Sequence, residues 1–157
     1  MNGARAWVAG PEEAETVAEL LVAFRDHLGR DRPSGNAFLA GVERLVEDPA
    51  TEFLLAAPRD GAPPAGVAQL RFRHSLWTAA PDCWLEDVYV AEPARRRGVA
   101  RALTQLACDR ARERGCRRIE LDASEGNAAA LALYEALGFT ARSKGSGARD
   151  LLLGRAL

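Results

Sequence analysis

A short basic turn between a strand and a helix is the segment of this sequence best suited to chemistry. Residues 88–101 read VYVAEPARRRGVAR, so an apolar strand ends, arginines follow, and a helix opens on small residues. Unpaired backbone N–H groups at the start of a helix bind anions, and the helix dipole adds a favourable potential there. Gly98 and Ala100 allow close approach of a ligand, and the arginines can hold further phosphates. The pattern predicts a pyrophosphate site.

Other interpretations of this turn fit less well. It lacks the G-x-x-x-x-G-K-S/T pattern of a phosphate-binding loop and the G-x-G-x-x-G pattern of a dinucleotide fold, so ATP and NAD are disfavoured. Adjacent arginines alone more often form a solvated surface than a site. Their position directly after a strand favours the binding site.

The overall composition describes an ordinary soluble domain. The 157 residues are 48% hydrophobic and 27% charged, which supplies a core and argues against a disordered or fibrous chain. Because 21 Lys+Arg nearly balance 22 Asp+Glu, no global field favours nucleic acid or an anionic membrane. No stretch approaches the ~18 apolar residues of a membrane span, and the first ten residues do not resemble a signal peptide. We therefore expect a cytoplasmic protein.

Rare residue types narrow the chemistry further. Lys144 is the only lysine, which together with the abundant alanine indicates GC-rich, bacterial codon usage. Cys83, Cys108 and Cys116 are odd in number and lack C-x-x-C spacing, so we expect reduced, packed thiols and neither a disulfide framework nor a zinc site. His27 and His74 share no motif, and a catalytic or metal-binding function for them is disfavoured.

The elements around the basic turn follow from hydrophobic periodicity and turn residues. Alternating apolar residues predict strands, and helical spacing predicts helices, two of which end at Gly115 and Gly138. The expected order is a strand at 5–9, helices at 11–22 and 38–46, strands at 52–57, 66–73 and 84–90, a helix at 98–114, a strand at 118–123, a helix at 128–137, and strands at 139–143 and 148–153. No linker or repeat interrupts this order, which predicts one α/β (α+β) domain over residues 1–157.

Two motifs in this order resemble the GCN5-related N-acetyltransferase (GNAT) family. The family's cofactor motif, Q/R-x-x-G-x-G/A after a strand and at the start of a helix, is matched by Arg95, Gly98 and Ala100. Residues 127–139 read NAAALALYEALGF, which is similar to the family's second signature, N-x-x-A-x-x-L-Y-x-x-L-G-F. The resemblance covers about residues 84–139. It implies a GNAT-like, mostly antiparallel mixed sheet with helices on both faces and a splayed strand pair that holds the cofactor.

The resemblance also implies acetyl-CoA as cosubstrate and no metal. Acetyl-CoA would lie where the strand at 84–90 splays from the strand at 118–123. Its pantetheine arm would run along Val88, Tyr89 and Val90, pairing with the backbone of the two valines as an extra strand would. Asn127 would hold the arm from the other side. The pyrophosphate would bind the N–H groups of Arg96, Arg97, Gly98, Val99, Ala100 and Arg101.

Acetyl transfer to an amine needs a proton donor for the departing thiolate. The resemblance places the Tyr134 hydroxyl near the cofactor sulfur, and a phenol with an ordinary pKa near ~10 is protonated at neutral pH. Outside this signature, Tyr134 would be interpreted as a core aromatic, because it shares a helix face with Leu133 and Leu137. We expect Tyr134 to be the catalytic acid.

The amine must also lose a proton, and Glu86 is the candidate base, directly or through a water. Neighbouring carboxylates in a strand point to opposite faces, so Glu86 and Asp87 cannot both serve one pocket. By strict alternation Asp87 shares its face with Leu85 and Tyr89. A salt bridge is the alternative for either residue. Together with Asp122, these carboxylates would attract a cationic amine.

The predicted function is acetyl-CoA-dependent transfer of an acetyl group to a primary amine in a ternary complex. The acceptor could be a small amine, an amino acid, an antibiotic or a protein N-terminus, since a fold does not determine its substrate. The segments 27–36 and 74–83 are expected to choose it, and Trp77 and Trp84 are candidates to line the acceptor pocket, with burial the alternative for Trp84. A catalytically silent acetyl-CoA sensor and an arginine-mediated nucleic-acid binder are the alternatives. The family resemblance is compatible with a homodimer.

Overall fold

The computed structural model describes residues 3–157, which form two compact units. The chain passes from the first unit to the second between Leu121 and Asp122.

The first unit is built on a five-stranded sheet in the order β1-β2-β3-β4-β5. Its strands are β1 (Arg5–Val8), β2 (Thr51–Ala57), β3 (Gly66–Ser75), β4 (Ala80–Val90) and β5 (Ile119–Glu120). Neighbouring strands are antiparallel except β4 and β5, which are parallel. The predicted mixed, mostly antiparallel sheet is confirmed.

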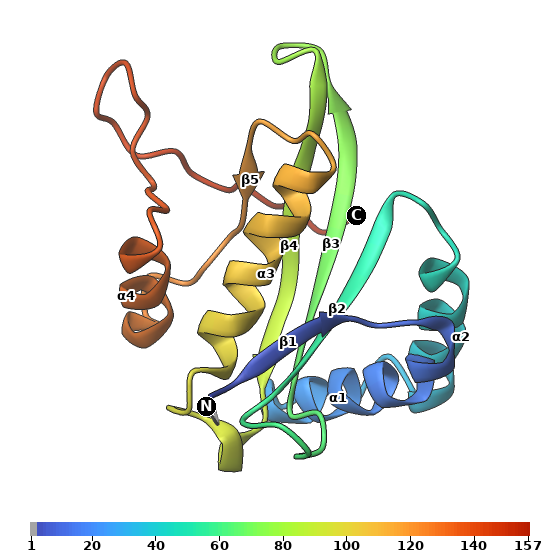
Figure 1. Cartoon of the computed structure of the whole chain (residues 1–157). Helices are drawn as coiled ribbons and strands as arrows, with labels where there is room; N and C mark the ends of the chain where they lie inside the picture. The colour runs from blue at the N-terminus through green and yellow to red at the C-terminus, as the bar shows by residue number, and fades with distance from the viewer. Residues whose placement is uncertain (1–2) are drawn as a thin grey trace. The chain divides into compact units, whose positions relative to one another are not determined.

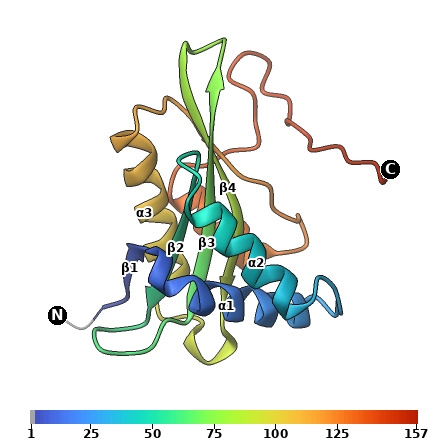
Figure 2. The ribbon, with the colours of Figure 1, turned by 90° about the vertical axis from the view of Figure 1, so that its right-hand side faces the viewer.

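Helices cover both faces of this sheet. α1 (Ala14–His27) follows a short 3-10 turn, η1 (Pro11–Glu13), and α2 (Gly35–Val46) begins after Ser34, whose hydroxyl accepts the Ala37 N–H at 3.2 Å. A second 3-10 turn, η2 (Glu92–Ala94), precedes α3 (Val99–Glu113). Figure 1 shows α3 on one side of the strands, and Figure 2 shows α1 and α2 on the other. Within residues 3–157, no helix has both the length and the apolar character needed to cross a membrane.

Alternation along the strands divides the core into two layers. Phe53, Leu55 and Val67 pack beneath α1 and α2, whereas Leu54 and Leu70 pack beneath α3. The α3 layer is close-packed at its N-terminal end. A Cβ on Gly66 would lie 2.6 Å from Val99 Cγ1, so only glycine lets β3 approach α3 this closely.

A buried carboxylate also ties α3 to the sheet. Glu52 of β2 accepts hydrogen bonds from Arg110, and Arg114 lies 3.7 Å away. The Glu52 side chain is only 9% exposed, so these cations balance a charge that would be costly to bury alone. The ion pairs fix the position of α3 across β2.

The β3–β4 hairpin is longer than the sequence predicts. Residues 74–83, expected as a loop, continue the ladder through the pairs His74↔Pro81 and Ser75↔Ala80. Pro81 suggested a loop because it cannot donate a ladder hydrogen bond. It is tolerated here because β5 pairs with β4 only at Cys83 and Trp84, which leaves β4 an edge at Pro81.

The second unit contains α4 (Ala128–Ala136), which ends before Gly138 at φ +92°. The strands predicted at 139–143 and 148–153 are wrong as regular strands. The Arg142↔Arg149 bridge is isolated, and the Ser143 N–H donates to Ala148 O at 2.8 Å. Within this unit the hairpin has no third strand to pair with, and a two-stranded hairpin alone is marginal.

Candidate functional site

A β-bulge near the end of β4 shapes the candidate site. Gln69 pairs with Glu86 and Val67 pairs with Tyr89, so one residue on β3 faces two residues on β4, Asp87 and Val88. Asp87 has φ +52°, in the left-handed region that aspartate visits more readily than most residues. The bulge was not predicted, because an aspartate in a strand is a weak signal for it.

The bulge changes which backbone groups face the open edge of β4. The Cys83 N–H donates to Arg118 O at 3.0 Å, toward β5, whereas the Ala91 N–H donates to Ala65 O at 2.8 Å, toward β3. In a regular strand these two odd-numbered N–H groups would point to the same edge. The extra residue reverses the alternation, so the N–H groups of Val88 and Val90 point to the edge away from β3.

That edge carries little pairing of its own. β5 pairs with β4 at Cys83 and Trp84, and these are the only β4 residues in the described chain that pair with β5. Beyond Trp84 the first unit therefore presents an open strand edge, which is a ready template for an extended ligand. This arrangement agrees with the predicted splayed pair, although β5 is shorter than the predicted strand at 118–123.

The turn after β4 presents a row of free N–H groups. Arg96 and Gly98 have φ +62° and +80°, and Gly98 is the N-cap of α3. The first helical bond beyond this turn runs from the Ala102 N–H to Gly98 O at 2.9 Å. Within residues 3–157 the N–H groups of positions 96–101 have no backbone acceptor. Such a row at a helix N-terminus binds anions.

The arginines of this turn divide into two kinds. The Arg95 side chain is used by the protein itself, because its Nε donates to Val90 O at 3.0 Å and so steadies the turn. Arg96, Arg97 and Arg101 are exposed and make no ion pair within the described chain. Guanidinium groups in this state are available to an anionic ligand. The sequence predicted a ligand contact for all four.

Glu86 lies on the α1/α2 face of the sheet. Its register partner Gln69 and the next pair along, Val67 and Tyr89, share that face, whereas Leu85 packs beneath α3. The strict alternation expected from the sequence is therefore wrong, because the bulge puts Leu85 and Tyr89 on opposite faces. Glu86 is half-buried, and its partner Gln69, which no sequence pattern singled out, is buried.

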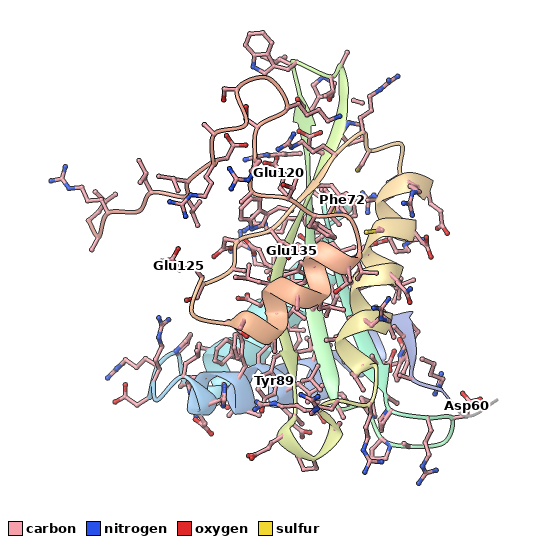
Figure 3. The ribbon with its side chains drawn as sticks, turned by 90° about the vertical axis from the view of Figure 1, so that its left-hand side faces the viewer. Asp60, Phe72, Tyr89, Glu120, Glu125 and Glu135 are labelled. Atoms are coloured by element: carbon pink, nitrogen blue, oxygen red, sulfur yellow. The ribbon has the colours of Figure 1, made fainter. Side chains whose placement is uncertain are left out.

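Tyr89 joins this face to α1. Its ring stacks on Phe24 with centroids 5.1 Å apart, and the His27 ring lies 6.0 Å away. Tyr89 is labelled in Figure 3. His74 is exposed far along β3, so the two histidines do not form one site within the first unit. In the described chain no group of three His, Cys, Asp or Glu side chains is placed to hold a metal ion.

The second unit carries the other two predicted site residues. Tyr134 of α4 is buried, and its ring meets Phe139 edge-on at 5.8 Å. Burial, and secondly the Asp122 carboxylate, raise the pKa of the Tyr134 phenol, which keeps it protonated at neutral pH. Asn127 is the N-cap of α4, where its Oδ1 accepts the Ala130 N–H at 3.2 Å. α4 with Glu135 is drawn in Figure 3.

The remaining candidates lie elsewhere in the first unit. Trp77 is 99% exposed at the tip of the β3–β4 hairpin, whereas Trp84 is half-buried on the Glu86 face. Cys83 is buried beneath α3, and burial raises the pKa of its thiol to about 12. Burial also raises the pKa values of Cys108 and Cys116. The structure records all three as free cysteines that stay protonated at neutral pH.

Comparison with known proteins identifies the class of this fold and site. The model of the acetyltransferase (GNAT) family matches residues 15–139. A solved structure from Arthrobacter sp. FB24, a candidate acetyltransferase, is 30% identical with a TM-score of 0.86 over 97% of this chain and 95% of that one. The chain belongs to the GNAT acetyltransferase family.

Two proteins of similar sequence are named as acetyltransferases. The mycothiol acetyltransferase of Beutenbergia cavernae is 41% identical over 150 residues, which are 88% of this chain and 46% of that protein. The thialysine N-epsilon-acetyltransferase of Caenorhabditis elegans is 31% identical over 133 residues, 83% of this chain and 81% of that protein. The chain thus spans about half the length of the first relative and most of the second.

Proposed function

We propose that this protein is an acetyl-CoA-dependent N-acetyltransferase that acetylates a primary amine by direct transfer. The observation that carries the proposal is the continuity of two features of the first unit. The open edge of β4 leads directly into the row of free N–H groups at positions 96–101. A ligand with an extended amide arm would pair with the open strand edge, and a pyrophosphate at the end of that arm would meet the free N–H groups. Acetyl-CoA has both groups in this order. Family membership and the named relatives support the same reaction.

The residues present fit acetyl-CoA, which supplies an activated acetyl thioester when bound. The N–H groups of Val88 and Val90 would pair with the pantetheine amides, and those of positions 96–101 would hold the pyrophosphate. Arg96, Arg97 and Arg101 would contact further phosphates. Arg95, whose Nε donates to Val90 O, would position the turn and remains a predicted contact of the cofactor.

Two proton transfers are assigned to side chains. Glu86 would remove the amine proton, directly or through a water, on the face that also carries Gln69. Tyr134 would donate a proton to the departing thiolate, and its raised pKa keeps that proton in place until transfer. N–H groups at the bulge would polarise the acetyl carbonyl. Asn127, whose Oδ1 caps α4, would offer its amide N–H groups to the arm.

The proposal also covers the extent of the domain, its cellular location and its origin. We infer that residues 1–157 act as one acetyltransferase domain, because the family match at 15–139 runs across the boundary between the two units. Free cysteines are typical of a reducing compartment, which supports a cytoplasmic location. A bacterial origin is supported by the arginine-rich composition and by the bacterial relative. The reaction needs no metal from the protein.

The test is acetyl-CoA-dependent CoA release, read by mass spectrometry so that the protein's thiols do not interfere. The acceptor panel contains polyamines, amino acids, aminoglycosides and N-terminal peptides near pH 8. Turnover on one class establishes the enzyme and its acceptor together. Saturable CoA binding without turnover on any class would instead favour a sensor, and the absence of CoA binding would refute the proposal.

A further inference from the structure

A basic cavity lies between α2 and β3, on the same face of the sheet as Glu86. Its volume is about 600 Å³, which is in the usual range for small-ligand sites. It is lined by Gly41, Arg44, Leu45, Asp48, Pro49 and Arg71. The turn that binds the pyrophosphate contributes none of these residues, so the cavity is a separate feature of the first unit.

The two arginines of the cavity have no protein partner. Arg44 and Arg71 are both exposed, and the side chain of neither makes a hydrogen bond or ion pair within the described residues. Arg110 and Arg114 of the same unit, by contrast, are engaged by Glu52. The one carboxylate in the lining, Asp48, already accepts the Ala50 N–H at 2.8 Å. Two unpaired guanidinium groups at one cavity are suited to a carboxylate.

Strand register places the cavity beside the proposed catalytic base. Arg71 lies two residues from Gln69 on β3, and Gln69 is the register partner of Glu86. Residues two apart in a strand share a face and are separated by roughly 6.6 Å. An acceptor whose amine is at Glu86 would therefore reach Arg71 only with a group several bonds away. An α-carboxylate is only two bonds from its amine nitrogen, so it fits this spacing less well than a more distant carboxylate does.

The helix dipole accounts for the position of Arg44 in the cavity but not for that of Arg71. Arg44 lies in the last turn of α2, where a cation is favoured by the negative end of the helix dipole. Arg71 lies in a strand, where no helix dipole favours a cation. Its neighbour on the same face, Arg73, differs in that its register partner is the carboxylate residue Asp82. Arg71 is therefore the residue that most strongly indicates an anionic ligand in this cavity.

We propose that Arg71 and Arg44 bind a carboxylate of the acceptor, so that the acceptor is an amine with a carboxylate several bonds from its nitrogen. An ω-amino acid or a short peptide has this chemistry, and a polycationic amine does not. This inference rests on the proposed acetyl transfer. It adds the substrate class that the site selects.

The first test compares 6-aminohexanoate with its amide, 6-aminohexanamide, as acceptors. The wild type is expected to prefer the acid by about tenfold or more in kcat/KM, which is the effect of a charge-assisted hydrogen bond. Arg71→Gln is expected to bring this preference to within twofold, and Arg44→Gln to reduce it. The matched control Arg73→Gln, on the same strand and face but outside the cavity, is expected to keep it.

The second test does not depend on turnover. Calorimetry measures the binding of 6-acetamidohexanoate to the CoA-loaded protein, with 6-acetamidohexanamide as the neutral comparison. Arg71→Gln is expected to weaken binding of the acid about tenfold and leave the amide unaffected. Equal binding of acid and amide to the wild type, or equal losses in Arg71→Gln and Arg73→Gln, would overturn the inference. Absence of acetylation on every amine would refute the proposed function alone, because the calorimetry decides the carboxylate site separately.

Discussion

Gly98 offers a direct test of the proposed pyrophosphate site, because its backbone conformation and the row of free N–H groups depend on each other. It caps α3 at φ +80°, in the region that costs an L-residue roughly 1–2 kcal/mol. The nearest atom to an added Cβ is Ala4 Cβ at 3.8 Å, an ordinary contact. Gly98→Ala therefore introduces backbone strain without a clash.

The strain is expected to appear as lost affinity for CoA. The N–H groups at 96–101 make no backbone hydrogen bonds within the described chain, and the Arg95 bond to Val90 O is made from before this stretch, so the backbone of 96–101 can shift when no ligand is bound. In Gly98→Ala the free turn can relax, and CoA binding must restore the strained conformation. A cost of roughly 1–2 kcal/mol corresponds to a factor of about 5–30. We expect the Kd for CoA to rise by that factor.

Gly61→Ala is the matched control. Gly61 has φ +74° with no atom within 4 Å of an added Cβ, and it lies in the turn between β2 and β3. The substitution carries the same backbone cost away from the proposed site. Calorimetry with CoA and urea unfolding are run on both variants. A Kd for Gly98→Ala within twofold of wild type, or an equal rise in Gly61→Ala, would refute the reasoning.

Three further measurements test other parts of the structure. Tyr134→Phe is expected to lower kcat by about 10²-fold with CoA affinity retained, the usual scale for a lost general acid; unchanged turnover would remove Tyr134 from the mechanism. Leu103→Ala, at a fully buried α3 position, is expected to cost about 2–5 kcal/mol in urea unfolding, well above Leu106→Ala at a half-buried one; equal costs would contradict the described core. Because the folded pKa of Cys83, about 12, exceeds its ordinary 9.0, the unfolded chain ionises first as pH rises. Wild-type unfolding free energy is therefore expected to fall more than that of Cys83→Ala between pH 9 and 12, and parallel pH profiles would disprove this.

The candidate site was predictable to the extent that it depends on local backbone. The turn after β4 was identified from residues 95–101 alone, because glycine, small residues and arginines at a helix start define an anion site regardless of the rest of the fold. The order of strands and helices in the first unit followed from periodicity for the same reason. The bulge at Asp87 did not, since whether a strand residue is extra depends on its partner strand.

The sequence by itself determined the family, and it predicted the anion-binding turn and the side chains proposed to react. Only the tertiary structure decided which of them share a face. It set Glu86 with Gln69 and Tyr89 because the bulge reverses the alternation of β4. It turned Arg95 onto Val90 O, and it brought Arg44 to the cavity that Arg71 lines. These two arginines are separated in the chain by the end of α2, all of β2 and the first half of β3, and only packing of α2 on the sheet makes them neighbours.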